Sequence, residues 1–218
     1  MLSVSEKNGI DLLEEKDINI LSVGISTAGT AEIEMLKKNP KSHIIATTID
    51  EEGIKNTKKI IQDCNLEERI ELKIEDISKK LDYEDETFDF VYARLVLHYL
   101  DNQRLTNALS EINRILKKNG KFFVVVRSVN AWEAKLEGSS YDEETGLTKH
   151  PDLKTYGTEN VKYCYRRLHS EESIRSFLEK AGFVVKHIKT YEECLSIDYD
   201  RKNMNEKASE LIEVLSIK

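Results

Sequence analysis

The sequence predicts an α/β protein of the doubly wound, Rossmann-like class, with a mainly parallel seven-stranded sheet and one antiparallel edge strand. Short apolar, β-branched segments alternate with amphipathic segments between residues 18 and 126, which is the pattern of repeated strand–helix units around a parallel sheet. Small or acidic residues directly follow several apolar segments. In such sheets, ligands bind at the edge formed by the carboxyl ends of the strands, which is where these residues would lie.

Composition limits the class of protein further. The chain has 218 residues, 39% of them hydrophobic and 33% charged, which fits one water-soluble domain spanning residues 1–218. No segment approaches the roughly 20 apolar residues of a membrane span, and the first residues do not resemble a secretory leader, so we expect a cytoplasmic protein with no membrane contact. The net charge of −7 argues against nucleic acid as a partner. The scattered cysteines and histidines predict neither disulfides nor a metal site.

The elements follow in chain order. Apolar runs predict strands at residues 18–23, 43–49, 69–74, 88–93 and 122–126. Helices are predicted between them, from about 28 to 38, from 51 to about 64, and from 101 or 102 to a stop at Gly120. The last of these has apolar residues three and four apart, which is typical of a helix with one buried face.

The regular alternation stops after residue 127. Residues 128–166 are polar and aromatic without a clear period, and an insertion of that length is usually a lid or a binding element. We expect it to form a cap in which Trp132, Tyr156 and Tyr163 cover a substrate. A self-packed lid or a homodimer contact through the cap are the alternatives. A helix capped by Ser170 then leads to a strand from residue 183 and a last strand at 211–217. Their short connection predicts an antiparallel pair.

Three strand ends carry candidate ligand-binding residues. The first is the small-residue turn containing Gly24, Ser26 and Gly29, which precedes a helix N-terminus and suits a carboxylate or phosphate. The second is Asp50, which can accept hydrogen bonds from two ribose hydroxyls. The third is the pair Glu75–Asp76, where an acid can accept from an adenine amino group.

With these residues the chain resembles the class I S-adenosylmethionine-dependent methyltransferases. The resemblance covers residues 18–126 and 169–183, and its most specific parts are residues 87–100 and 112–121. It implies S-adenosylmethionine as cofactor, with the glycine turn at the methionine moiety, Asp50 at the ribose and Asp76 at the adenine. The positions expected at or near the cofactor are Gly24, Ser26, Gly29, Asp50, Glu75, Asp76, Ile77 and Leu95.

The chain departs from the family pattern in its first turn. Ser22 stands where the family usually has an acid, and Ser26 and Ala28 stand where it usually has glycine. A non-catalytic binding or regulatory protein that has kept the fold is therefore an alternative. The spacing of Gly24, Ser26 and Gly29 before Asp50 also resembles a degenerate dinucleotide fingerprint, so an NAD-binding Rossmann protein is a second alternative.

Residues that act on the substrate are expected after the fourth and fifth strands. His98 is a candidate general base, or a packed histidine without a chemical role. Arg94 and Arg127 follow the same two strands, and each either holds an acidic substrate or forms a supporting salt bridge. The motifs that position a nucleic-acid base are absent. The sequence thus predicts a methyltransferase for a small-molecule acceptor, whose identity it does not indicate.

Overall fold

The computed structural model describes residues 2–14, 16, 18–25, 29–196 and 204–218. Its main sheet has seven strands in the order β3-β2-β1-β4-β5-β10-β9. Their bounds in that order are Ile70–Ile74, His43–Thr48, Asn19–Val23, Phe88–Arg94, Leu116–Arg127, Ser209–Ile217 and Val184–Glu193. The pairs among β1 to β5 are parallel, whereas β10 is antiparallel to both β5 and β9. The predicted fold class is confirmed, and the reversed strand β10 lies one position inside the edge strand β9.

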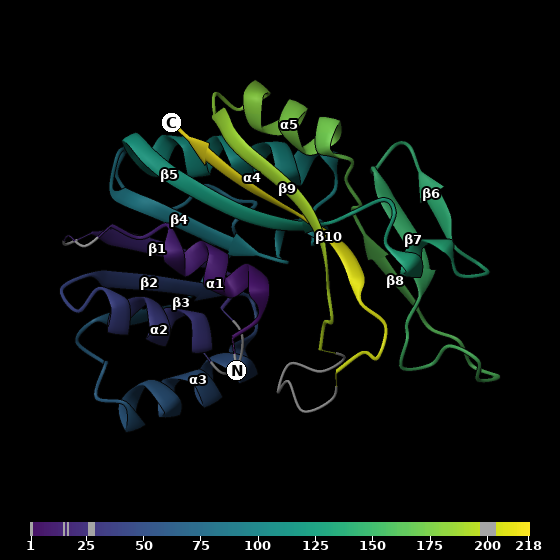
Figure 1. Ribbon diagram of the computed structural model, residues 1–218, viewed down its shortest axis with the longest axis horizontal. Coiled ribbons are helices and arrows are strands. Elements are labelled where there is room, and N and C mark those ends of the chain that lie inside the picture. Colours follow the sequence, from purple (N-terminus) through teal and green to yellow (C-terminus); the bar gives the residue numbers. More distant parts are fainter. Residues whose placement is uncertain (1, 15, 17, 26–28, 197–203) are drawn as a thin grey trace.

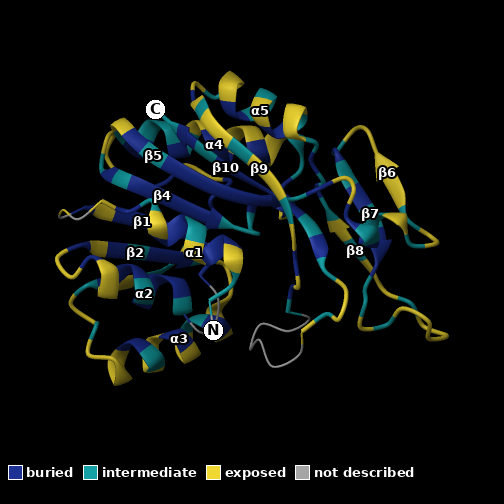
Figure 2. Ribbon diagram, viewed as in Figure 1, coloured by how far each residue is buried: buried dark blue, intermediate teal, exposed yellow. Residues whose placement is uncertain are grey.

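Helices cover both faces of this sheet (Figure 1). On one face lie α1 (Val4–Asp11), α2 (Thr30–Lys38) and α3 (Glu51–Asp63), and on the other lie α4 (Asn102–Ile115) and α5 (Glu171–Lys180). Phe90 of β4 belongs to the apolar cluster of the first face and its neighbour Val91 to that of the second, because successive strand residues point to opposite sides. Figure 2 shows the central strands as buried and the outer helix surfaces as exposed.

The N-terminal helix α1 was not predicted, although its start carries a recognisable signal. Ser3 and Glu6 form a capping box, in which each side chain accepts from the other residue's backbone N–H. Gly9 lets this helix approach the sheet closely, since a Cβ there would lie 2.7 Å from the Tyr92 ring and 2.9 Å from the Phe123 ring. The helix thereby lies over β4 and β5.

The prediction that Gly120 ends the helix beginning at residue 101 or 102 is wrong. Helix α4 ends at Ile115, and β5 begins at the next residue. Leu116 is fully buried and pairs with Phe88 of β4, so burial of an apolar side chain in the sheet ends the helix. Gly120 lies within β5, where a Cβ would come within 2.8 Å of the Leu116 side chain. By contrast, Gly182 does follow α5 in the left-handed conformation expected of a helix stop (φ 91°).

Residues 128–166 contain a short helical turn, η2 (Trp132–Lys135), and three strands: β6 (Ser140–Asp142), β7 (Leu147–Pro151) and β8 (Tyr163–Arg166). These strands form an antiparallel sheet, which we call the cap sheet, beside the carboxyl end of β5 (Figure 1). Arg167 fastens it to the main domain through hydrogen bonds to Leu100 O (3.1 Å), Asn102 Oδ1 (3.0 Å) and Thr145 O (2.8 Å). In the part of the chain that the structure describes, no helix is long and apolar enough to cross a membrane.

Candidate active site

The structure brings most of the predicted cofactor residues to one edge of the main sheet. Gly24, Asp50 and Glu75 each follow the last residue of β1, β2 or β3 within two positions, and Leu95 directly follows β4. These four strands are parallel neighbours, so their carboxyl ends share one edge. Ser26 lies outside the described residues.

The glycine turn after β1 is shaped by its own packing. Gly24 has φ 78° and donates its N–H to Thr47 O (2.8 Å). A Cβ on Gly24 would lie 2.7 Å from Cγ2 of Val96, so the segment after β4 closes over this turn. Gly29 precedes α2 in the left-handed conformation (φ 55°) without a side-chain cap. Both glycines therefore stand where other residues would be strained.

A buried carboxylate stands beside Ser22. Ser22 Oγ–H donates to Glu32 Oε1 at 2.5 Å, and both residues are at most 3% exposed. Glu32 belongs to the first turn of α2, where the positive end of the helix dipole favours an anion. The Glu32 carboxyl group of α2 thus lies beside position 22 of β1, where this chain has serine and the family usually has an acid. Sequence reasoning missed Glu32, because an acid in a first helical turn is usually a surface residue.

Asp50 has one oxygen engaged and one available. Its Oδ1 accepts from the backbone N–H groups of Glu52 (3.1 Å) and Gly53 (3.0 Å) and so caps α3. Its Oδ2 has no partner among the described residues, and the residue is exposed. The same side chain can therefore cap the helix and accept hydrogen bonds from a ligand.

The acids after β3 differ in environment. Burial raises the pKa of Glu75, although its Oε2 accepts from the Tyr83 hydroxyl (2.9 Å). Burial also opposes ionisation of Asp76, but donation from Ser78 Oγ (2.7 Å) and N (3.0 Å), with Arg104 nearby, holds its pKa below the ordinary value. Ile77 is 6% exposed and belongs to the core. Asp76 is thus the acid whose charged form is favoured at this strand end, whereas burial disfavours the charged form of Glu75.

His98 lies in a buried turn that follows β4. This turn, η1 (Leu97–Tyr99), comes after Leu95, whose left-handed conformation (φ 54°) turns the chain away from the strand. His98 is 2% exposed, and neither of its ring nitrogens has a hydrogen-bond partner among the described residues. Burial first, and the positive charges of Arg127 and Arg166 next, hold its pKa well below 6.5. The imidazole is therefore neutral at pH 7.

Arg94 is engaged by the protein itself. Its Nε donates to Ser5 Oγ (2.6 Å) and its Nη2 pairs with the Glu193 carboxylate, whose side chain is 5% exposed. Glu193 also accepts from the Ser5 backbone N–H at 2.9 Å. This cluster joins α1, β4 and β9. The contacts of Arg94 are those of the supporting salt bridge that the sequence left open.

The predicted substrate residues of the cap do not all gather near His98. Arg127 does, at the end of β5, where it pairs with Glu133 of η2 (2.7 Å). Trp132 has a buried indole N–H with no partner among the residues that the structure describes, and Lys207 Nζ lies 5.0 Å from the ring centroid. Tyr156 and Tyr163 are 45% and 41% exposed. Tyr163 neighbours Cys164, the partner of His150, so it points to the opposite face of the cap sheet.

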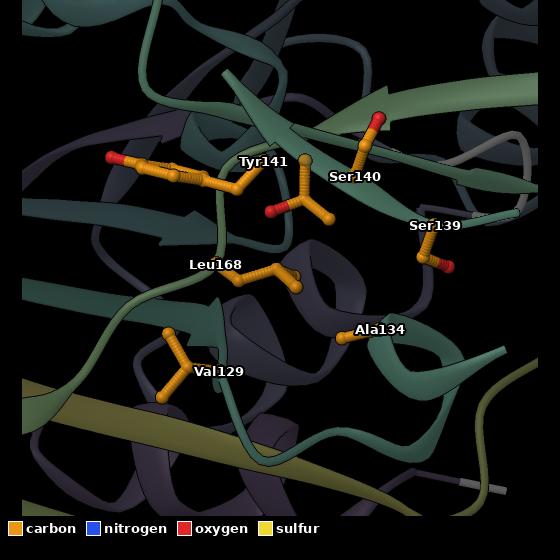
Figure 3. Close-up of a pocket in the computed structure, with 7 residues that line it drawn as sticks. Val129, Ala134, Ser139, Ser140, Tyr141 and Leu168 are labelled. Atoms are coloured by element: carbon orange, nitrogen blue, oxygen red, sulfur yellow. The ribbon is translucent and has the colours of Figure 1, made fainter. Parts of the chain in front are cut away.

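A separate pocket of about 280 Å³ opens within the cap (Figure 3). Its lining residues come from the end of β5, η2, the cap sheet and the segment before α5: Val129, Ala134, Ser139, Ser140, Tyr141, Thr148 and Leu168. Thr148 pairs with Arg166 across β7 and β8, so the pocket and Arg166 share one face of the cap sheet. None of the predicted cofactor or catalytic residues lines it.

Comparison with known proteins supports the predicted class. Residues 21–124 match the family model described as a methyltransferase domain. This match supports the class I S-adenosylmethionine-dependent methyltransferases as the family and favours S-adenosylmethionine over NAD as the cofactor. A comparison with curated protein sequences finds no match.

Solved structures share the fold at low sequence identity. A SAM-dependent methyltransferase from Methanosarcina mazei aligns with a TM-score of 0.72 at 19% identity, covering 95% of each chain. One from Mesorhizobium loti aligns at 0.68 and 14% identity, covering 99% of this chain and 98% of its own. The [4+2]-cyclase SpnF aligns at 0.65 and 17%, covering 98% and 79%. At such identities the likeness shows the fold alone, and the cyclase is a case in which this fold serves another reaction.

The edge residues fit the cofactor that the family implies. Asp50 presents an exposed oxygen without a partner, as a ribose site requires. Asp76 is kept charged after β3, where the family places the adenine. Gly24 turns the chain between β1 and α2 without a side chain.

Proposed function

We propose that this protein transfers a methyl group from S-adenosylmethionine to a small-molecule acceptor in the cytoplasm. Bound S-adenosylmethionine supplies an electrophilic methyl group. The observation that supports a role in chemistry is His98, in the turn that follows β4, whose two ring nitrogens are buried and have no partners in the described part of the chain. Buried polar atoms are nearly always paired, so an unpaired imidazole indicates a group reserved for a ligand.

The chain's own residues then have distinct roles. Asp50 and Asp76 would hold the ribose and the adenine of the cofactor, and the Gly24 turn would hold its methionine moiety. His98, neutral because of burial and nearby arginines, accepts the proton that the acceptor releases during the displacement. Arg94 holds α1 and β9 against β4 through Ser5 and Glu193. The cap sheet excludes water from the reacting groups.

A calorimetric titration of the purified protein with S-adenosylmethionine, S-adenosylhomocysteine and NAD tests the proposal. We expect both sulfur compounds to bind and NAD not to bind. Acceptors are then screened by the release of S-adenosylhomocysteine. Failure of both sulfur compounds to bind a folded, ligand-free sample would overturn the enzyme proposal and favour the non-catalytic alternative.

A further inference from the structure

Two arginines below the cap have fewer negative partners than their charge requires. Arg127, at the end of β5, uses Nη1 in its ion pair with Glu133, while its Nε is buried and has no partner in the ranges that the structure describes. Arg166, on β8, forms no ion pair within the described residues, and its Nε is also buried without a partner. Both of them lower the pKa of His98, so all three side chains belong to one cluster.

The neighbours of this cluster do not supply the missing anion. Arg166 Nη1 donates to His150 Nε2 (3.2 Å), and His150 Nδ1–H donates to Pro151 O (3.0 Å), which fixes His150 as a neutral ring. The second oxygen of Glu133 accepts from Ser209 Oγ (2.8 Å). The Tyr99 ring centroid lies 5.8 Å from the Arg166 guanidinium carbon, and this cation–π contact supplies no negatively charged group. Among the described residues, Arg127 therefore has one carboxylate partner, Glu133, and Arg166 has none.

Such an excess of one positive charge in a largely buried cluster is costly. Only 12% of the Arg127 side chain and 3% of the Glu133 side chain remain exposed, and Arg166, which lacks a carboxylate partner among the described residues, is partly buried. A charge without a partner becomes less favourable as it is removed from water. Burial first, and the positive charge of Arg166 next, lower the pKa of Arg127, against the opposing effect of Glu133. A ligand with a single negative charge would balance the cluster.

The cluster lies next to the edge of the main sheet that carries the predicted cofactor residues. His98 follows β4, whose next residue, Leu95, donates its N–H to Val125 O of β5 (2.9 Å). Val96 of the same segment lies against Gly24. The Arg167 N–H donates to His98 O (2.7 Å), which brings β8 to this turn. A ligand anchored here lies under the cap and beside the cofactor edge.

From these contacts we infer that Arg127 and Arg166 bind a carboxylate of the methyl acceptor, with His98 beside it, so that the substrate is a small carboxylic acid. This inference rests on the proposed function. The two guanidinium groups donate to the carboxylate oxygens, as is usual for arginine and carboxylate. Burial is the main cause of the low pKa of His98, and the charges of Arg127 and Arg166 add to it, so a bound carboxylate offsets the contribution of the two arginines.

The test uses benzoate and its neutral isostere benzamide as probes, with inorganic phosphate as a third arm. Each is titrated into the full chain saturated with S-adenosylhomocysteine, and the histidine ring signals are followed by NMR. We expect benzoate to bind at least tenfold more tightly than benzamide or phosphate and to shift the His98 signals. Equal binding of benzoate and benzamide would overturn the inference. Tighter binding of phosphate than of benzoate would overturn the assignment to a carboxylate.

Variants distinguish a binding role from a structural one. Arg166→Gln should weaken benzoate binding at least tenfold, while S-adenosylhomocysteine binding stays within twofold of the parent protein. Arg166→Lys should retain part of the benzoate affinity. Arg175→Gln is the matched control, because Arg175 lies on α5 with an exposed partner, Glu179. If Arg166→Gln leaves benzoate affinity unchanged, the inference fails. If the parent protein does not bind S-adenosylhomocysteine at all, the proposed function fails instead.

Discussion

Replacing Asp50 separates its two roles, because each oxygen has a different task. Oδ1 accepts from the Glu52 and Gly53 N–H groups at 3.1 and 3.0 Å, whereas Oδ2 has no partner within the described part of the chain. Asparagine keeps an oxygen for the helix cap but replaces the other with an amide that cannot accept. Alanine removes both. The two variants should therefore differ in stability and agree in cofactor binding.

The magnitudes follow from the bonds lost. Asparagine and aspartate cap helices about equally well, while alanine at this position costs roughly 1 kcal/mol of stability. A hydrogen bond to a charged acceptor contributes about 1.5–3 kcal/mol, and about 1.4 kcal/mol corresponds to a tenfold change in affinity. Both variants should thus bind S-adenosylhomocysteine roughly 10- to 100-fold more weakly. Only Asp50→Ala should lower the free energy of unfolding by about 1 kcal/mol.

Calorimetry measures the affinity, and urea unfolding measures the stability. Asp63→Asn is the control, since it removes the same charge from the exposed end of the same helix. An Asp50→Asn protein that binds S-adenosylhomocysteine within threefold of the parent would refute the assignment of Oδ2 to the ribose. A loss of binding in the control as well would point to net charge as the cause.

Three further predictions concern stability, each measured by urea unfolding. Gly24→Ala should lower the free energy of unfolding by about 2 kcal/mol or more, because of the positive φ at this position and the contact of the new Cβ with Val96. Adding Val96→Gly should recover part of that loss, and no recovery would contradict the contact. Arg94→Met should cost about 3–5 kcal/mol, because it leaves the buried Glu193 without its cation, and a loss below about 1 kcal/mol would argue against that pairing. Burial first, then Arg167, lowers the pKa of His169 to about 3, below the unfolded value of about 6.5. The contribution of His169 to the free energy of unfolding is therefore full above pH 6.5 and falls toward pH 3, by up to about 1.4 kcal/mol per pH unit. His169→Asn should flatten the pH dependence of the free energy of unfolding between pH 6 and 4.

The strands of the main sheet were predictable because their signal is local. Residues 122–126 form an apolar run, as a strand covered on both faces requires, and the structure buries them completely or nearly so. The end of α4 was not predictable in this way. Gly120 gives a strong local stop signal, but the pairing of Leu116 with Phe88 of β4 ends the helix earlier, and that pairing joins residues distant in sequence.

The cap sheet lacks the pattern by which strands are recognised. All three residues of β6 are exposed, and β8 alternates only between exposed and partly buried residues. Neither strand has an apolar face, so its residues resemble a loop. The same exposure places Tyr163 on the outer side of the cap sheet, although its aromatic character suggested a substrate cover.

The candidate site was predictable where topology alone determines position, and not where side chains reach across it. Gly24, Asp50 and Asp76 follow strands, and the rule for parallel sheets places such residues at one edge. Arg166 and His150 come from the cap, and their proximity to His98 depends on how β7 and β8 pair. Two adjacent arginines, Arg166 and Arg167, also differ in role, since only Arg167 is satisfied by backbone and amide oxygens.

Ser22 illustrates why a missing residue type does not establish a missing group. The absence of an acid at this strand position suggested a weakened cofactor turn, and that inference considered the strand alone. The structure brings the carboxylate of Glu32 to 2.5 Å from the Ser22 hydroxyl, from a helix turn whose dipole stabilises an anion. Serine is small enough to admit this carboxylate and supplies the hydrogen bond that its burial requires. A carboxyl group therefore remains at the base of the turn, now carried by α2 instead of β1, so the serine at position 22 does not by itself remove the acid from this turn.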